Sequence, residues 1–271
     1  MITNCELPLC MLGWDNFVLN DYDFILLHMM LDHPTYQHWA HDLRLIYPKR
    51  MMILDNSAYE FFVKGETLDM DKFVEVINEL KPDYYILPDV LRNKQKTLEG
   101  VETFLKKYKT PYSKPLAVAQ GNTSEELVEC LIRYAELGID YVGVPFHLSF
   151  YTEMEYDEDI VRRFMIVYND KETEDIRYAM GRVQWVRDHE NLLKSFQKVH
   201  MLGSHCPYEK RFYHDYYSMD TGYPVKLGYK GIQLEEEEAK PNIIIDDFFR
   251  EDLSDKQVMR IHQNVQRFRN Y

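Results

Sequence analysis

The stretch MILDNSAY, residues 52–59, is an apolar run that ends in an aspartate, Asp55, and passes at once into small, turn-forming residues. The stretch YYSMDTGYP, residues 216–224, has the same design around Asp220. An aspartate in such a position is expected where a buried strand opens into a loop. Two such aspartates from distant parts of one chain can face each other across a pocket, and a pair of carboxylates suffices for chemistry at a sugar carbon.

Strand-like and helix-like segments alternate around these two stretches. Apolar runs predict strands at residues 24–28, 51–54, 84–89, 116–121, 141–145, 199–203 and 217–220. Helical spacing and capping signals predict helices at residues 68–80, 98–108, 123–137 and 176–196, with another between the last two strands. Repeated strand–helix units favour a parallel α/β sheet, and their number favours a closed (β/α)8 TIM barrel, which typically has ~250 residues.

The sequence predicts a single barrel domain over all 271 residues. Residues 148–175 are acidic and less regular, which indicates an insertion or a long loop with a helix at 159–167. Residues 256–268 predict an amphipathic C-terminal helix. The four glutamates at 235–238 are the one low-complexity tract.

The ends of the predicted strands carry polar residues and glycines. In barrels of this kind the catalytic groups come from the carboxyl ends of the strands. One aspartate at a strand end is more often a turn residue or a helix cap, but several converging strand ends weigh more. We therefore expect one set of residues around a common mouth: Asp55, Asp89, Gln120, Gly143, Gly203 and Asp220.

The composition limits the classes of function. The formal net charge of −13 argues against a protein that coats nucleic acid non-specifically, because such binding depends on neutralising phosphates. It leaves room for an enzyme with a local basic groove. Basic residues cluster at 92–109 and again at 260–269, and a solvated helix face is the simpler interpretation of either cluster alone.

Cysteines and histidines give no metal pattern. The four cysteines form no CxxC pair, so we expect reduced thiols, no structural zinc and a cytoplasmic protein. His28, His147, His200 and His205 match no zinc spacing, and we interpret His147 and His205 as pocket or phosphate contacts. The sequence predicts no metal and no cofactor. It also predicts no signal peptide and no membrane span, because its longest apolar runs are far below ~18 residues.

Six segments together resemble the tRNA-guanine transglycosylase family, in particular its shorter DpdA-type relatives, which place 7-deazaguanines into DNA. They occur in the family's order. The segment DNSAYE at 55–60 is similar to D-S-G-G-[FY]-Q, and MDTGYPVK at 219–226 is similar to F-D-C-V-x-P-T-R. The other four are LPD at 87–89, VAQG at 118–121, GIDYVG at 138–143 and HMLG at 200–203.

This sequence departs from the family pattern at several positions, and these differences bear on whether the substrate is DNA or tRNA. Ser57 and Ala58 stand where the family has two glycines, and Lys226 stands where it has arginine. The zinc site of the tRNA enzymes, three cysteines and a histidine, has no counterpart here. The resemblance therefore implies a barrel without the zinc-binding subdomain, and DNA rather than tRNA as the partner. It also suggests a phage-type enzyme acting in a host cytoplasm.

The resemblance implies a role for each matching residue. Asp220 would be the nucleophile that attacks C1′, and Asp55 the general acid/base, although a cap through Asn56 or Ser57 explains Asp55 equally well. Asp89 would accept from N1–H and N2–H₂ of a guanine-like base, while Gln120 and the N–H of Gly143 would donate to O6. The remaining assignments are Tyr59 stacking on the base (with core packing as the simpler alternative), Lys226 at a phosphate, and the basic helix with Arg260 and Arg267 along the DNA backbone.

The activity implied is a base exchange that replaces guanine in DNA by a free 7-deazaguanine such as preQ0. The target base must leave the duplex stack or lie in an open strand. Three alternatives remain open at this point. The protein could be a hydrolase that releases bases from nucleosides or nucleotides, a tRNA-directed guanine transglycosylase, or a non-catalytic module that only binds a base.

Overall fold

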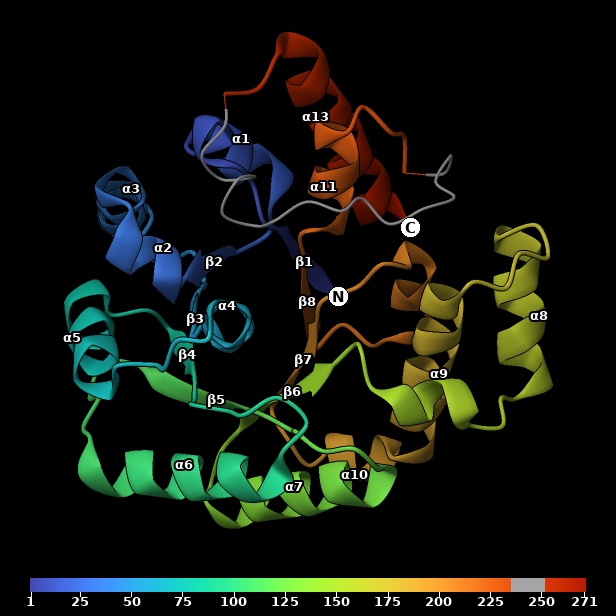
Figure 1. Ribbon diagram of the computed structural model, residues 1–271, viewed down its shortest axis with the longest axis horizontal. Coiled ribbons are helices and arrows are strands. Elements are labelled where there is room, and N and C mark those ends of the chain that lie inside the picture. The colour runs from blue at the N-terminus through green and yellow to red at the C-terminus, as the bar shows by residue number, and fades with distance from the viewer. Residues whose placement is uncertain (235–251) are drawn as a thin grey trace. The chain divides into compact units, whose positions relative to one another are not determined.

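The computed structural model describes residues 1–234 and 252–271, so the glutamates at 235–238 lie outside the described residues. The fold is α/β, with eight parallel strands alternating with helices as in a (β/α)8 TIM barrel, which confirms the predicted class. The strand order is β1-β8-β7-β6-β5-β4-β3-β2. The strands (Figure 1) are β1 (Ile2–Cys5), β2 (Asp23–Leu26), β3 (Met52–Asp55), β4 (Tyr84–Ile86), β5 (Lys114–Val118), β6 (Tyr141–Pro145), β7 (Lys198–Leu202) and β8 (Tyr217–Thr221).

The helices agree with most of the predicted segments. The α-helices are α1 (Trp14–Leu19), α2 (Leu27–Asp32), α3 (Pro34–Ile46), α4 (Ala58–Lys64), α5 (Met70–Leu80), α6 (Lys94–Lys107), α7 (Ser124–Glu136), α8 (Glu158–Val167), α9 (Glu174–Asp188), α10 (Glu190–Leu193), α11 (Tyr223–Tyr229) and α13 (Asp255–Asn270). Three 3₁₀ helices are η1 (Leu9–Met11), η2 (Ser149–Glu153) and η3 (Pro207–Phe212). No helix of the described residues combines the length and apolar character needed to cross a bilayer.

Several segments differ from the prediction. The strands predicted over 84–89 and 116–121 end at Ile86 and Val118, so Asp89 and Gln120 lie beyond the ends of their strands. The strand predicted through residue 28 ends at Leu26, and His28 already belongs to α2. The helix predicted over 176–196 is divided at His189 into α9 and α10. In the region predicted as an insertion or a long loop, 148–175, the expected helix at 159–167 is present as α8, and η2 and the start of α9 are further regular elements.

The chain divides into two compact units. The β1–β4 unit comprises Ile2–Ile86, Lys109–Lys114 and Asp220–Tyr271, and the β5–β7 unit comprises Leu87–Tyr108 and Pro115–Met219 together with Met1. The end of β8, from Asp220 onward, therefore belongs to the β1–β4 unit. Each unit is described by itself.

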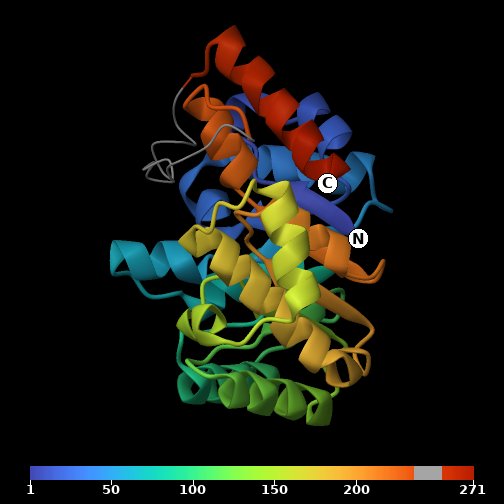
Figure 2. The same ribbon diagram turned by 90° about the vertical axis from the view of Figure 1, so that its right-hand side faces the viewer.

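In the β1–β4 unit, β2 pairs with β3 in a register that sets Leu26 opposite Asp55. Strand β1 is tied to the start of β2 without ladder pairing, because Asn4 Nδ2 donates to Tyr22 O at 2.8 Å and the Asp21 N–H donates to Thr3 O at 3.0 Å. Helices α11 and α13 lie side by side (Figures 1 and 2). The apolar face of α13 is buried, which confirms the predicted amphipathic helix.

In the β5–β7 unit, β6 pairs with β7 along its whole length, from Tyr141 opposite Lys198 to Pro145 opposite Leu202. Helix α9 is the most buried helix of this unit and packs on η2 and α8 (Figure 2). Its Arg182 and Glu209 of η3 have side chains that are 0% exposed. An apolar cluster of this unit includes Phe146, Phe164 and Val183, and the Arg182 guanidinium lies over the Phe146 ring at 4.6 Å.

Gly181 of α9 should tolerate no side chain. A Cβ built on it would lie 2.1 Å from Tyr151 O, a backbone atom that cannot move alone. We expect Gly181→Ala to lower the free energy of unfolding by roughly 2 kcal/mol or more, because overpacking displaces backbone. Gly100 in α6 is the matched control, since its Cβ would meet its nearest atom, Pro88 O, at 3.6 Å. Gly100→Ala should be neutral or stabilising by up to about 1 kcal/mol. Urea unfolding of both variants tests this, and equal midpoints would contradict it.

Candidate active site

Asp55 and Asp220 both lie in the β1–β4 unit, at or near the carboxyl ends of their strands. Asp55 is the last residue of β3 and is partly exposed. Asp220 is the next-to-last residue of β8 and is only 7% exposed. The predicted strand-end positions of these two carboxylates are therefore present in the structure.

Glu6, which the sequence analysis did not single out, is a close partner of Asp220. It directly follows β1, and its backbone N–H donates to Thr221 O at 3.1 Å. Burial raises the pKa of Glu6 to about 8, and the negative charge of Asp220 and a hydrogen bond between the two carboxyl groups add to the rise. Lys226 opposes the shift and Glu60 adds to it. Two carboxyl groups this close share a proton rather than ionise together.

Tyr36 connects the end of β2 with this carboxyl pair. Its hydroxyl accepts from the Leu26 N–H at 3.0 Å, next to the register position of Asp55. Burial raises the pKa of Tyr36, and the charges of Glu6 and Asp55 raise it further. A small cavity about the size of one water molecule is lined by Glu6, Leu26 and Tyr36 among others. The charges of Asp55 and Glu6 thus both act on Tyr36, and the charge of Asp220 acts on Glu6. All four residues belong to the β1–β4 unit.

Asp55 also has a local structural role. Its Oδ2 accepts from the Ser57 N–H at 2.7 Å, and Asn56 Oδ1 accepts from the Ala58 N–H at 2.8 Å. These bonds support the turn before α4, where Ser57 adopts a left-handed φ of 54°. The turn explanation weighed for Asp55 is therefore present, through its bond to Ser57, and the acid/base role stays a prediction.

Two further predicted residues of this unit, Tyr59 and Lys226, lie on the helices that follow β3 and β8. Tyr59 on α4 is 56% exposed, so the core-packing interpretation of this residue is wrong. Lys226 on α11 is partly buried and acts on the carboxyl of Glu6. A Cβ built on Gly222 would lie 3.2 Å from Glu6 Oε2 and 3.3 Å from Lys226 Cε. Gly222 is therefore the position at which these two side chains approach the backbone.

The residues predicted to read the base lie in the β5–β7 unit. Gln120 is 3% exposed; its Nε2 donates to Asp89 Oδ2 at 2.6 Å, and its Oε1 accepts from the Arg92 N–H at 3.0 Å. The amide fixes the Asp89 carboxylate. An amide nitrogen carries two hydrogens, of which this bond uses one. The structure therefore brings Asp89 and Gln120 into contact with each other, and their contacts with a base stay predictions.

Gly143 has a structural explanation of its own. It lies in the middle of β6, and its carbonyl accepts from the Ala119 N–H at 3.0 Å. A Cβ on Gly143 would lie 2.6 Å from Leu202 Cδ1 and 3.0 Å from Val118 Cγ2. Core side chains of the neighbouring strands use the space that glycine leaves. This packing accounts for the glycine without a base, and the contact with O6 stays a prediction.

The basic helix makes contacts within its own unit. Arg260 on α13 donates to Gln233 Oε1 at 3.0 Å, and Arg267 on the same helix is partly buried. Arg269 forms an ion pair with Asp21 and donates to Val18 O at 2.9 Å. These bonds hold α13 against the unit, and nothing in them bears on DNA.

The raised pKa of Glu6 predicts how stability depends on pH. The folded value of about 8 lies above the ordinary value of 4.5, so between these pH values the folded state binds a proton that the unfolded state releases. This stabilising contribution is complete below about pH 4.5 and is lost as pH rises through about 8. From pH 5 to 8.5, we expect the wild type to lose roughly 4 kcal/mol more than Glu6→Gln.

The measurement is urea unfolding of both proteins at several pH values. Glu66→Gln, which changes an exposed carboxyl, serves as the control and should follow the wild type. Parallel pH curves for the wild type and Glu6→Gln would show that Glu6 titrates normally.

Glu6 and Tyr36 are thus the site residues that sequence reasoning missed. Both enter the site through contacts with residues distant in the sequence, and the one sequence signal for Glu6 is an acidic residue directly after a short apolar segment. Comparison with known proteins adds no homologue: the chain matches no protein-family model and no curated protein.

Proposed function

We propose that this protein is a base-exchange enzyme that replaces guanine in a polynucleotide by a 7-deazaguanine. DNA is the proposed polynucleotide. The observation that carries the proposal is the pair of Asp220 and Glu6, with the pKa of Glu6 raised to about 8 by burial and by Asp220. With its proton, Glu6 relieves the repulsion between the two carboxyl groups. Asp220 then bears the negative charge that a nucleophile at C1′ requires.

The reaction runs in two displacements. Asp220 attacks C1′ of the target nucleotide, the C1′–N9 bond breaks, and the departing guanine takes a proton from Asp55. The product is a glycosyl ester on Asp220. The incoming base then attacks C1′ through its N9, its N9 proton passes to Asp55, and the ester bond breaks. Two inversions restore the original configuration, as in retaining glycosidases.

Glu6 acts through Asp220 and is a positioning residue in this scheme. Its proton holds one oxygen of Asp220 by a hydrogen bond and leaves the other for C1′. The charge of Lys226 lowers the pKa of Glu6 and so limits the rise that burial and Asp220 produce. In the β5–β7 unit, Asp89 and Gln120 have the donor and acceptor groups that complement the N1, N2 and O6 edge of guanine. Adenine lacks this pattern.

The test is an exchange assay with guanine-labelled substrates and unlabelled preQ0. Separate reactions contain single-stranded DNA, duplex DNA, tRNA and free deoxyguanosine. We expect label release from DNA beyond one equivalent per enzyme only in the presence of preQ0, with equal incorporation of preQ0 and an intact backbone. Release beyond one equivalent per enzyme without an incoming base, or from free deoxyguanosine, would identify a hydrolase instead. Exchange on tRNA alone would identify the tRNA-directed activity, and tight base binding without release would identify a binding module.

A further inference from the structure

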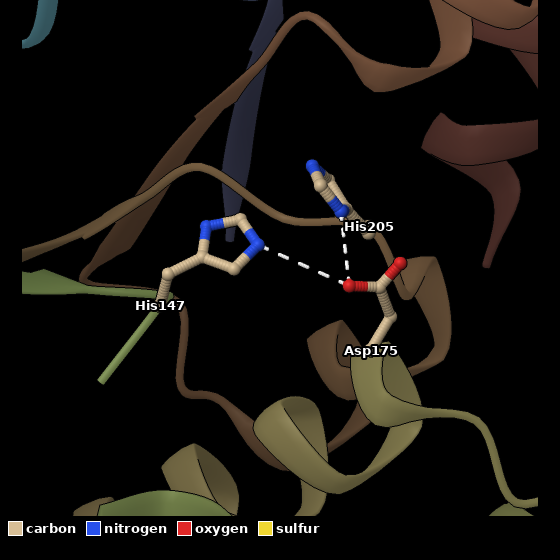
Figure 3. A group of neighbouring side chains, drawn as sticks. All are labelled: His147, Asp175 and His205. Carbon is tan, nitrogen blue, oxygen red and sulfur yellow. Dashed lines mark ion pairs between the residues drawn. The ribbon is translucent and has the colours of Figure 1, made fainter. Parts of the chain in front are cut away.

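Two histidines and an aspartate form a compact cluster in the β5–β7 unit (Figure 3). His147 follows β6, His205 follows β7, and Asp175 lies in the first turn of α9. Asp175 Oδ1 is 3.2 Å from His205 Nδ1 and 3.9 Å from His147 Nε2. The three atoms all lie within 4.8 Å of one another.

These distances fit one metal ion. A tetrahedral ion with bonds of about 2.1 Å separates its ligand atoms by about 3.4 Å. The pair of Asp175 and His205 is already near that value. His147 has the most exposed side chain of the three, at 43%, so a small rotation of its ring can complete the set. Figure 3 shows both imidazole rings directed toward the same carboxylate oxygen.

The backbone that carries the cluster is firmly held. Arg182 lies on the same helix as Asp175, and its guanidinium donates to Leu202 O at 2.9 Å and to Gly203 O at 2.8 Å, at the end of β7. It also donates to Val144 O at 3.4 Å near the end of β6. Gly203, with φ of 61°, turns the chain toward His205. One buried cation thus ties together the three elements that present the cluster, and rigid support of this kind is what a metal site needs.

We propose that His147, Asp175 and His205 bind one divalent transition-metal ion, with Zn²⁺ as the representative. Two imidazole nitrogens and one carboxylate oxygen are the ligands of zinc and of ferrous-type ions, whereas Mg²⁺ and Ca²⁺ prefer oxygen alone. Three protein ligands leave at least one coordination position for water or a ligand oxygen. The exposed side of His147 gives solvent access to that position.

The test uses tag-free protein treated with a chelator and dialysed. Titration calorimetry with Zn²⁺ should give one site per chain with submicromolar affinity. Co²⁺ in place of Zn²⁺ should give visible absorption bands of four- or five-coordinate geometry. His147→Ala, His205→Ala and Asp175→Asn should each weaken Zn²⁺ binding at least about 100-fold, because each removes a ligand.

His214→Ala is the matched control. His214 Nε2 also pairs with a carboxylate, Glu190 at 2.8 Å, but on an exposed surface where the described residues offer no third ligand. The Zn²⁺ affinity of His214→Ala should equal that of the wild type. Titration of the wild type with Mg²⁺ should produce no binding heat. His147→Ala is the decisive variant, because an exposed side chain can be removed without unfolding the protein. Millimolar wild-type affinity, or equal affinity of His147→Ala, would overturn the proposal. Asp220→Asn should bind Zn²⁺ normally, so this test is independent of the exchange reaction.

Discussion

Asp220→Asn is expected to lower the rate of base exchange at least about 1,000-fold. The amide has the shape of the carboxylate but lacks the charge that attacks C1′. Asp220 is 7% exposed and beside Glu6, so a neutral isostere also removes a repulsion and should leave the fold intact. The measurement is incorporation of labelled 7-deazaguanine into single-stranded DNA by wild type and variant at equal folded concentration.

Asp215→Asn is the control for this variant. It removes the same charge from an exposed carboxylate close in sequence to Asp220, and it should retain full activity. Rescue by Asp220→Glu should be weak, since a longer side chain moves the carboxylate away from its position. More than a tenth of wild-type activity in folded Asp220→Asn would rule out this residue as the nucleophile.

Arg182→Met is expected to lower the free energy of unfolding by about 3–5 kcal/mol. The guanidinium makes two bonds with Glu209, at 3.0 and 2.6 Å, in a site where both side chains are 0% exposed. Glu209 also accepts from Tyr213 at 2.9 Å and from Ser204. Removing the cation leaves a buried carboxylate without its counter-charge, and it also releases the carbonyls of Leu202 and Gly203.

A second variant separates the charge from the packing. Arg182→Met combined with Glu209→Gln removes both charges and should recover part of the loss. Arg162→Met is the control: its ion pair with Asp159 is exposed, so the change should remain within about 0.5 kcal/mol. Urea unfolding of the three proteins gives the comparison. A loss below about 1 kcal/mol in Arg182→Met would mean that the buried pair contributes little.

The strands that could be predicted are those made of continuous apolar runs. Residues 52–54 and 141–144 are buried along their whole length in a parallel sheet, and such strands show in sequence as apolar segments. Strand β1 escaped because two of its four residues, Thr3 and Asn4, are polar and are satisfied by distant partners, Asp21 and Tyr22. The register and the order of the strands could not be predicted from the sequence and come from the structure.

The residues of the candidate site also fall into two groups: those marked by the local sequence and those that depend on contacts in the folded chain. Asp55 and Asp220 could be found because each ends an apolar run. Glu6 could not, because its raised pKa arises from burial and from contact with Asp220, and both are products of the folded chain. The proposed metal site of His147, Asp175 and His205 was also not predicted as a group, because it too is a product of the folded chain. Its three residues come from three separate elements, so no local spacing marks them.

The central claim is that the Asp220 carboxylate becomes covalently bonded to C1′ of the target nucleotide. Its most direct test is to incubate the protein with a guanine-containing DNA oligonucleotide without an incoming base, quench under denaturing conditions, and map the adduct by peptide mass spectrometry. We predict an ester between the oligonucleotide and Asp220, absent in Asp220→Asn and discharged by added preQ0. An adduct on another residue, or complete exchange without any adduct, would contradict the account.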